Sequence, residues 1–208
     1  MTDSQPSGAA PPSTAPAAAG KRERLVAAAR QLFHEQGVEK TTLAEIAAAA
    51  EVPVGNVFYY FKTKDAIVAS VIAAYGDTQG AVSGMLDRRR TPQARLKALV
   101  RTWVDRRELF ASHGCPVGTL ASELGKRDDE LRTEAGNVLL GLIGWVQEQF
   151  EAMGRRDARE LAVALIAAYE GIALLANTLH DPALVSAEGR RLERWIDTLA
   201  PDDEVTRA

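Results

Sequence analysis

Apolar residues recur along most of this chain at spacings of three and four, with polar and charged residues between them. This spacing places the apolar side chains on one side of an α-helix, and it therefore predicts an amphipathic helix wherever it persists. In the first such segment, Lys21 to Gln36, the apolar stripe includes Leu25, Leu32 and Phe33. The next residue, Gly37, is suited to end a helix.

The same pattern, interrupted by glycines and prolines, divides the rest of the chain into further helices. No segment shows the strict alternation of apolar and polar residues that is typical of a half-buried strand. We therefore predict an all-α protein with about nine helices. They cover residues 21–36, 42–50, 53–60, 63–90, a segment from 91 onward, a short helix that ends at 124, then 128–153, 157–180 and 186–199.

Two of these helices are short and lie close together in the sequence, with a turn between them. Thr42 and Glu45 have the spacing of a capping box, which predicts that Thr42 is the N-cap of the second helix. Val52 precedes Pro53, and a residue before proline is disfavoured in helical conformation, so the turn is placed here. A third helix then runs from about Pro53 to Tyr60. This order is typical of a helix-turn-helix, whose second helix enters a DNA major groove.

Composition narrows the class of protein. The first twenty residues are rich in Pro, Ser, Ala and Gly, lack the features of a secretory signal, and predict a disordered tail. The single cysteine, Cys115, excludes an intramolecular disulfide and favours a reducing cytoplasm. No run approaches the roughly 20 apolar residues that cross a bilayer. We expect a tail (1–20), a DNA-binding domain (21–67), a ligand-binding and dimerisation domain (68–200) and a second tail (201–208).

The distribution of charge agrees weakly with this division. The net charge of −3 argues against a protein that coats nucleic acid with its whole surface. Residues 21–67 nevertheless carry a net charge of +1, whereas residues 68–208 carry −3. Three basic residues crowd the start of the first helix and indicate either contact with phosphate or a solvated basic end: Lys21, Arg22 and Arg24.

The third helix begins with side chains that can read bases. A recognition helix needs small or polar residues at its leading end, where it meets the base edges. Val54, Gly55 and Asn56 occupy that end. An asparagine can bond an adenine edge through two hydrogen bonds, and the Val54 methyl groups can contact a thymine methyl.

Groups that can hold phosphate follow directly. Tyr59 and Tyr60 carry hydroxyls, and Lys62 and Lys64 carry cations. Tyrosines in such a run are also common in cores, so the pattern alone leaves both interpretations open. Each phosphate neutralised adds about −0.9 to the slope of log affinity against log salt.

The order of these pieces resembles the DNA-binding domain of the TetR family of bacterial regulators. The resemblance extends from Arg24 to Ile67 and rests on LFHEQGV, TTLAEIAAAAEV and NVFYYFKTKDAI. It implies that Thr42 flanks the DNA backbone, that Lys64 binds phosphate, and that the recognition positions are Val54, Gly55, Asn56, Phe58 and Tyr60. Two residues depart from the family pattern: Pro53 replaces the frequent serine N-cap, and Ala44 replaces a base-contacting arginine.

In the TetR family the C-terminal helices form a dimer interface and a ligand cavity. Two-fold pairing suits DNA geometry, because two recognition helices read a palindrome. The segment 161–179 is apolar on more than one face, and we expect it to pair with a partner subunit. The final helix carries a matching stripe of Leu192, Trp195, Ile196 and Leu199. The alternative is that both helices are buried only against their own chain.

Outside the first domain, three residues are candidates for binding an effector: Trp103, Cys115 and Trp145. The segment GCPVGTLASEL resembles one in some TetR-family members, a few of which sense electrophiles or oxidants through a cysteine. A helix that starts at Pro116 would lower the pKa of the Cys115 thiol and make it reactive. A lone cysteine is more often a small buried apolar side chain.

The resemblance implies a homodimeric transcriptional repressor that a small apolar ligand releases from a palindromic operator. An electrophile-sensing repressor and a helical interaction module without DNA binding are the alternatives. We expect no enzyme, since the motifs of hydrolases, metalloproteases and phosphate-binding loops are missing. We also expect neither cofactor nor metal, because His34 and His180 lack ligand partners at helical spacing.

Overall fold

The computed structural model describes residues 20–127 and 130–199, and it contains ten helices and no strand within these residues. The predicted tails therefore lie outside the described residues, except for Gly20, and so does Asp128, the predicted start of one helix. The helices are α1 (Lys21–Gln36), α2 (Leu43–Ala49), α3 (Val54–Tyr60), α4 (Lys64–Leu86), α5 (Pro92–Val104), α6 (Arg107–His113), α7 (Pro116–Leu124), α8 (Glu130–Ala152), α9 (Ala158–Leu179) and α10 (Pro182–Thr198).

The all-α class is confirmed, and the differences lie at helix ends. The predicted fifth helix is divided near Asp105 into α5 and α6, which accounts for the tenth helix in the described part of the chain. The last helix begins earlier than predicted, because Asp181 caps it by accepting a hydrogen bond from the Ala183 N–H (2.9 Å). The fourth helix ends at Leu86, before the predicted Arg90.

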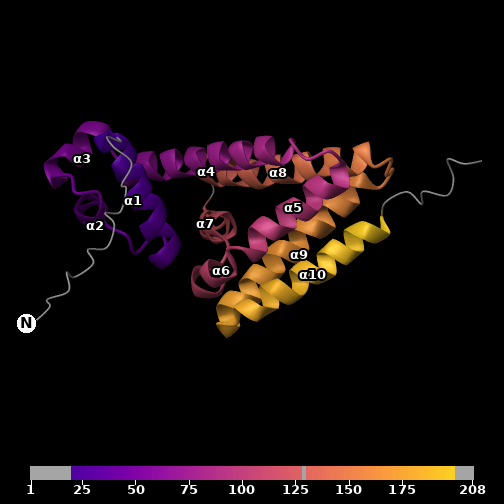
Figure 1. The fold of residues 1–208 in the computed structure, drawn as a ribbon. Coiled ribbons are helices and arrows are strands. Elements are labelled where there is room, and N and C mark those ends of the chain that lie inside the picture. Colours follow the sequence, from indigo (N-terminus) through magenta and orange to yellow (C-terminus); the bar gives the residue numbers. More distant parts are fainter. Residues whose placement is uncertain (1–19, 128–129, 200–208) are drawn as a thin grey trace, which may run out of the picture.

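Helix α4 connects the two ends of the molecule. Figure 1 shows α1, α2 and α3 together at one end, and α4 running from them alongside α8. Helices α5, α9 and α10 lie at the other end, where α9 packs against α8 and α10 packs against α5. Helices α6 and α7 lie between these two groups (Figure 1). Helices α4 and α7 therefore both contact α1, the first of the N-terminal helices.

Two hydrophobic clusters form the core. The first joins α1, α2, α3 and the first half of α4, and it also includes Leu120 and Leu124 of α7 and Leu131 of α8. The second is built from α5, α6, α9 and α10 with the end of α8. The first cluster thus extends beyond the N-terminal helices, and α7 contributes directly to the packing beneath them.

The expectation that no segment is long and apolar enough to cross a membrane is wrong for helix α9. With 22 residues, it is long and apolar enough to cross a membrane by length and composition. A core helix passes the same test, and α9 packs against α6, α8 and α10. Its buried face includes Leu165, Ile166 and Tyr169.

Candidate functional site

Helix α2 begins at the predicted capping box. The Thr42 hydroxyl accepts a hydrogen bond from the Glu45 N–H (3.2 Å), and the Glu45 carboxylate accepts one from the Thr42 N–H (2.7 Å). These bonds lower the pKa of Glu45. Ile46 and Ala47 then point into the core, while Thr42 and Ala44 stay exposed. The cap therefore sets where α2 starts and leaves its outer face free.

The turn between α2 and α3 is tight. Glu51 adopts a positive φ of 53°, in the left-handed region, and the Val52 N–H donates to the Ala47 carbonyl (2.9 Å). Val52 is 5% exposed and anchors the turn to the core. Pro53 precedes α3 without a side-chain cap, as the departure from the family pattern predicted. The turn is held by backbone bonds and by burial of Val52.

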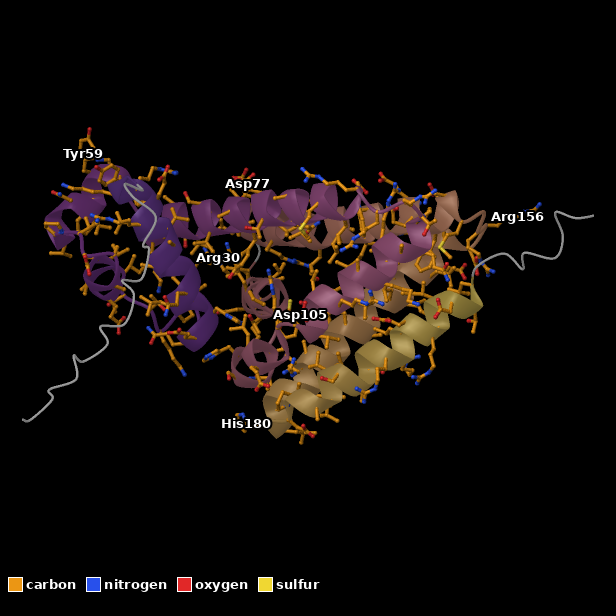
Figure 2. All side chains as sticks on the ribbon, in the orientation of Figure 1. Arg30, Tyr59, Asp77, Asp105, Arg156 and His180 are labelled. Carbon is orange, nitrogen blue, oxygen red and sulfur yellow. The ribbon has the colours of Figure 1, made fainter. Side chains whose placement is uncertain are left out.

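Helix α3 separates its residues between core and solvent. Val57 is fully buried, and Phe61 after the helix is 3% exposed. Val54, Phe58 and Tyr59 point outward with exposures of 53%, 51% and 78%. Figure 2 shows Tyr59 projecting beyond the end of the molecule. A helix that exposes large apolar and aromatic side chains on a monomer surface presents a binding face.

The remaining candidates on α3 lie beside this face. Gly55 is exposed, and Asn56 and Tyr60 are half-buried. The Tyr60 ring packs edge to face against Tyr59, with centroids 4.9 Å apart. The structure therefore brings all the predicted recognition positions together on one short helix.

The two candidate lysines flank α3. The Lys62 ammonium donates to the Phe58 carbonyl (3.0 Å), and the Lys64 ammonium donates to the Glu39 carbonyl (3.2 Å). Among the basic residues at the start of α1, Arg22 is already engaged within the chain, because its guanidinium lies over the Phe61 ring (5.1 Å) and donates to Ser70 (3.1 Å). Both lysines carry surface cations beside the exposed face of α3.

A carboxylate of α7 holds the loop between α1 and α2. The Glu123 side chain accepts hydrogen bonds from the Val38 N–H (2.9 Å) and the Glu39 N–H (2.8 Å). Gly37 allows this approach, since its φ is +87° and a Cβ there would lie 3.2 Å from Glu123 Oε2. Sequence reasoning missed this contact, and no local signal reveals it, because the partners are separated by 85 residues.

Two further contacts join the N-terminal helices to the rest. Arg127 forms a two-bond ion pair with Asp65 at the start of α4 (2.8 and 3.1 Å), and this pair lowers the pKa of Asp65. His34 of α1 bonds through Nε2 to the Gly114 carbonyl (3.0 Å). Burial lowers the pKa of His34, which favours its neutral form. This histidine is used as a hydrogen-bonding group between helices.

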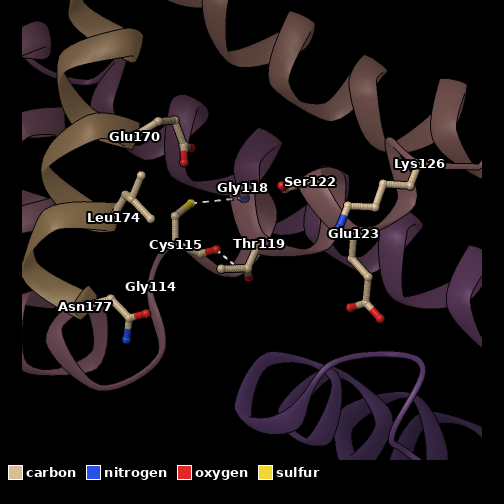
Figure 3. Close-up of a pocket in the computed structure, with 10 residues that line it drawn as sticks. All are labelled: Gly114, Cys115, Gly118, Thr119, Ser122, Glu123, Lys126, Glu170, Leu174 and Asn177. Atoms are coloured by element: carbon tan, nitrogen blue, oxygen red, sulfur yellow. Dashed lines mark hydrogen bonds between the residues drawn. The ribbon is translucent and has the colours of Figure 1, made fainter.

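Two cavities meet at Cys115. One of about 110 Å³ is lined by Trp103, Cys115 and Tyr169, together with residues of α1, α4 and α8. The Trp103 and Tyr169 rings stack there with centroids 4.1 Å apart. The other, of about 480 Å³, lies between α7 and α9 and is shown in Figure 3. Trp145 lines neither of these cavities. It lines a different pocket between α4 and α8, and its Nε1 donates to Asp87 (3.1 Å). The structure thus brings together two of the three predicted effector contacts.

Cys115 is the N-cap of α7, as its position before Pro116 suggested, but its thiol is not activated. The Gly118 N–H (3.3 Å) and the Tyr169 hydroxyl (3.2 Å) donate to Sγ. Burial, with the nearby Glu170 carboxylate, raises the pKa of the thiol to about 12. The expected lowering of this pKa is wrong, because loss of solvation outweighs the hydrogen bonds.

Glu170 of α9 lies beside Cys115 (Figure 3). Burial raises its pKa, and its Oε1 is the one buried side-chain oxygen or nitrogen in the described residues without a hydrogen-bond partner. A Cβ at Gly118 would collide with the Glu170 carboxylate, so a larger residue there requires the Glu170 side chain to move. No group of three or more potential metal ligands occurs within residues 20–127 and 130–199.

Helix α9 exposes several large apolar side chains, one of which, Leu174, also lines the larger cavity. Four of its large side chains are between 44% and 65% exposed: Val163, Leu174, Leu175 and Leu179. The stripe predicted on the last helix does not form an open face. Leu192 and Ile196 are buried in their own chain, and the Trp195 ring packs against the Phe150 ring with centroids 6.0 Å apart. Leu192 and Ile196 are therefore used within their own chain, whereas Trp195 and Leu199 stay half-buried.

Comparisons with known proteins cover most of the chain. Residues 25–71 match the bacterial regulatory proteins of the tetR family, and residues 92–188 match the C-terminal domain of LmrA/YxaF-like transcriptional regulators. The chain is 26% identical to an HTH-type transcriptional regulator in the lacX 3′ region of Lactococcus lactis, over 77% of this chain and 85% of the relative. It is 32% identical to the repressor DhaR of Mycobacterium sp. strain GP1, over 54% of this chain and 57% of the relative.

The fold is also shared with solved structures. A TetR transcriptional regulator from Legionella pneumophila superimposes with a TM-score of 0.79 at 20% identity, over 89% of this chain and all of that one. At that level of identity, the likeness concerns the fold alone.

Proposed function

The chain belongs to the TetR family of bacterial transcriptional regulators, and from this we propose that it is a homodimeric repressor that leaves a palindromic operator when a small molecule binds. The observation that carries the proposal is the outward face of α3, which exposes Val54, Phe58 and Tyr59 on a helix otherwise anchored in the core. As a member of this family the protein is a DNA-binding regulator and not an enzyme.

We assign roles on α3 and its flanks. Val54, Gly55 and Asn56 read base edges, with Phe58 beside them. Tyr59, Tyr60, Lys62 and Lys64 hold phosphates, and Thr42 flanks the backbone at the start of α2. The support is that these residues lie together on α3, on its flanks and at the α2 cap, around one exposed surface. Several relatives carry the word repressor in their names, which supports repression as the mode of regulation.

The dimer is supported by the open face of α9. Monomeric soluble proteins rarely expose a long contiguous apolar patch, and soluble oligomers are most often two-fold dimers. A second copy that packs its own α9 against this face buries the four large side chains. It also presents two α3 helices to one DNA duplex.

The effector is supported by the cavities around Cys115. The smaller one lies beneath α4, and it is walled by α1 and α5 as well as by α7 to α9. A ligand there contacts both the N-terminal helices and the C-terminal core. Coupling of about 1–3 kcal/mol between the two sites suffices for switching. Because burial raises the pKa of Cys115, its thiol is poorly suited to react with electrophiles. We therefore favour release from DNA by a bound ligand over release by electrophile sensing.

We propose 21–67 as the DNA-binding domain and 68–200 as the ligand-binding and dimerisation domain, with the protein acting in the cytoplasm where bacterial chromosomes lie. The two matched families, at 25–71 and 92–188, leave α4 as the connection between them.

Genome-wide footprinting with the purified protein tests the proposal. We expect protection of palindromic sites, and a mobility shift on the same sequences that weakens as salt is raised. A variant with alanine at Asn56, Tyr60 and Lys64 should lose this shift and keep its fold by circular dichroism. The absence of any protected site, or the same shift from the triple variant, would favour an interaction module without DNA binding.

A further inference from the structure

The smaller cavity carries a positive charge that its lining does not neutralise. Two arginines line it, Arg30 of α1 and Arg106 at the corner between α5 and α6, and no aspartate or glutamate does. Neither arginine forms an ion pair with a residue in 20–127 or 130–199. Arg30 is half-buried and Arg106 is exposed, so both guanidinium groups keep their charge and can donate hydrogen bonds. Two such cations beside one cavity favour an anion over a cationic or neutral ligand.

Arg30 is held in place by neutral groups. Its guanidinium lies over the Tyr75 ring, 4.5 Å from the centroid, and its Nη1 donates to the Thr78 hydroxyl (3.2 Å). Both contacts orient the guanidinium and leave its charge intact. Figure 2 shows Arg30 on the inner side of α4, whereas Asp77 of the same region points outward. The nearby acid is thus turned away from the cavity.

Glu170 belongs to the other cavity. It lines the larger cavity and not the smaller one, whereas Cys115 lines both. Burial raises the pKa of Glu170. Its carboxyl group therefore does not face Arg30 and Arg106 across the smaller cavity.

The rest of the lining is apolar or weakly polar. Val82, Leu99, Trp103 and Leu142 supply apolar surface. The volume of about 110 Å³ is smaller than the roughly 150 Å³ of an engineered cavity that holds benzene. The space therefore limits the apolar part of a ligand to one small ring or a short chain, with a charged group extending toward the exposed Arg106.

We propose that the effector is a small organic anion, such as a carboxylate with an apolar body, that binds between Arg30 and Arg106 with its apolar part against Trp103 and Leu142. This inference rests on the proposed function and names the chemistry of its ligand. Arg30 belongs to α1, so the anion contacts the DNA-binding helices directly. It competes with Tyr75 of α4 for the guanidinium, and this shifts α1 relative to α4.

Benzoate and benzamide are a matched pair of probes, because they share size and shape and differ in charge. Sodium chloride is added to the benzamide samples to equalise ionic strength. By thermal shift and calorimetry, benzoate should bind the full-length protein roughly tenfold or more tightly than benzamide, as expected for a charged hydrogen-bonded pair. Equal binding of the two probes, or no binding of benzoate at millimolar concentration, overturns the proposal.

Substitutions locate the site. Arg106→Gln should weaken the binding of benzoate roughly tenfold and leave the binding of benzamide unchanged. Because Arg106 is exposed, we expect this variant to fold normally. Arg30→Gln should do the same, and Arg30→Lys should keep part of the preference because it keeps the charge. Arg156→Gln is the control, since this exposed residue lies at the far end of the molecule (Figure 2). A preference that survives both glutamine variants refutes this location.

Operator binding measured on the same preparations separates the two proposals. A protein that prefers benzoate but binds no operator supports the anion site and refutes the repressor. A protein that binds its operator without any preference for benzoate keeps the repressor and refutes the anion site.

Discussion

At the scale of single residues, solvent exposure separates the side chains of α3 that pack in the core from those that are free to bind DNA. Val57 and Phe61 are buried, whereas Val54 and Phe58, which are equally apolar, are about half exposed. Apolar side chains are exposed in this way where another molecule covers them. The lysines beside α3 add the charge that DNA requires.

Lys64→Gln should reduce the slope of log affinity against log salt by about 2 for the proposed homodimer, because each of the two subunits loses one phosphate contact. The loss should be similar for all operator sequences, since phosphate contacts carry no base information. Mobility shifts across a salt series measure the slope. Lys97→Gln, on α5 and paired with Asp197 (2.9 Å), changes net charge equally and should leave the slope unchanged. An unaltered slope in Lys64→Gln would remove this residue from the interface.

Cys115 should react slowly with iodoacetamide at pH 8. A thiol with a pKa of about 12 carries on the order of a thousandfold less thiolate than one at 9.0, and it is buried as well. Mass spectrometry follows the labelling, with the urea-unfolded protein as the fast control. Labelling of the folded protein as fast as the unfolded one would restore the electrophile-sensing alternative.

The same pKa has a consequence for stability. The folded thiol holds its proton up to about pH 12, while the unfolded thiol loses it near 9.0. Its contribution to the free energy of unfolding is therefore complete below pH 9.0 and declines as pH rises toward 12. Tyr75 and Tyr169 have raised pKa values and act with the same sign. Because the Tyr169 hydroxyl donates to the Cys115 Sγ, urea denaturation of Cys115→Ser across pH 8 to 12 measures the loss of stability that the Cys115–Tyr169 pair causes together.

At the scale of elements, α7 contacts the two cavities at its first residues and the loop between α1 and α2 near its last. Cys115 at its start separates the two cavities, and Glu123 near its end holds the loop between α1 and α2. A ligand that displaces α7 therefore acts on the N-terminal helices without first moving α4. This route adds to the connection that α4 provides.

Glu123→Gln should loosen this connection. An amide offers one acceptor oxygen and places an NH₂ group against the second backbone N–H, so one of the two bonds is lost. Hydrogen exchange of the Val38 and Glu39 amides should become faster, and effector should release less DNA. Glu148→Gln, on the exposed surface of α8, is the matched control. Unchanged exchange at both amides would show that the Glu123 bonds do not hold the loop.

Gly189→Ala should destabilise the packing of α10 on α5. A Cβ at this position collides with the Val104 side chain, and overpacking costs about 1–3 kcal/mol. Gly80→Ala, in the middle of α4, has open space around its Cβ and should stabilise the helix by up to about 1 kcal/mol. Urea denaturation compares the two variants. Equal stability would mean that α10 moves away from α5 at little cost.

At the scale of the whole molecule, α9 lies between its own core and open solvent. One face holds Leu165, Ile166 and Tyr169 in the core, and the other exposes Leu174, Leu175 and Leu179. The partner that we propose for this face is a second copy of the chain, which would fit the proposed two-fold operator.

Leu175→Glu should convert the dimer to a monomer, because a charge placed in an apolar interface is not paired. Light scattering measures the mass, and operator affinity should fall with it. Met85→Glu is the control, as a 53% exposed apolar residue on α4. A Leu175→Glu protein that stays dimeric would place the interface elsewhere.

Much of this protein follows from local sequence. The spacing of Leu25, Leu32 and Phe33 determines a helix face, Thr42 and Glu45 determine where α2 begins, and Pro53 marks the turn. These features depend on residues within one or two turns, so they can be read without a structure. The family resemblance rests on the same local order.

Tertiary structure alone decided the rest. The same α7 N-terminus that predicts a reactive thiol lies in a buried site, and burial raises the pKa of Cys115 instead. Trp103 and Trp145 are equally apolar, yet only Trp103 reaches a cavity beside Cys115. Glu123 and Arg30 contact partners far away in the chain. Desolvation and long-range contacts depend on which helices meet, and local sequence does not specify that.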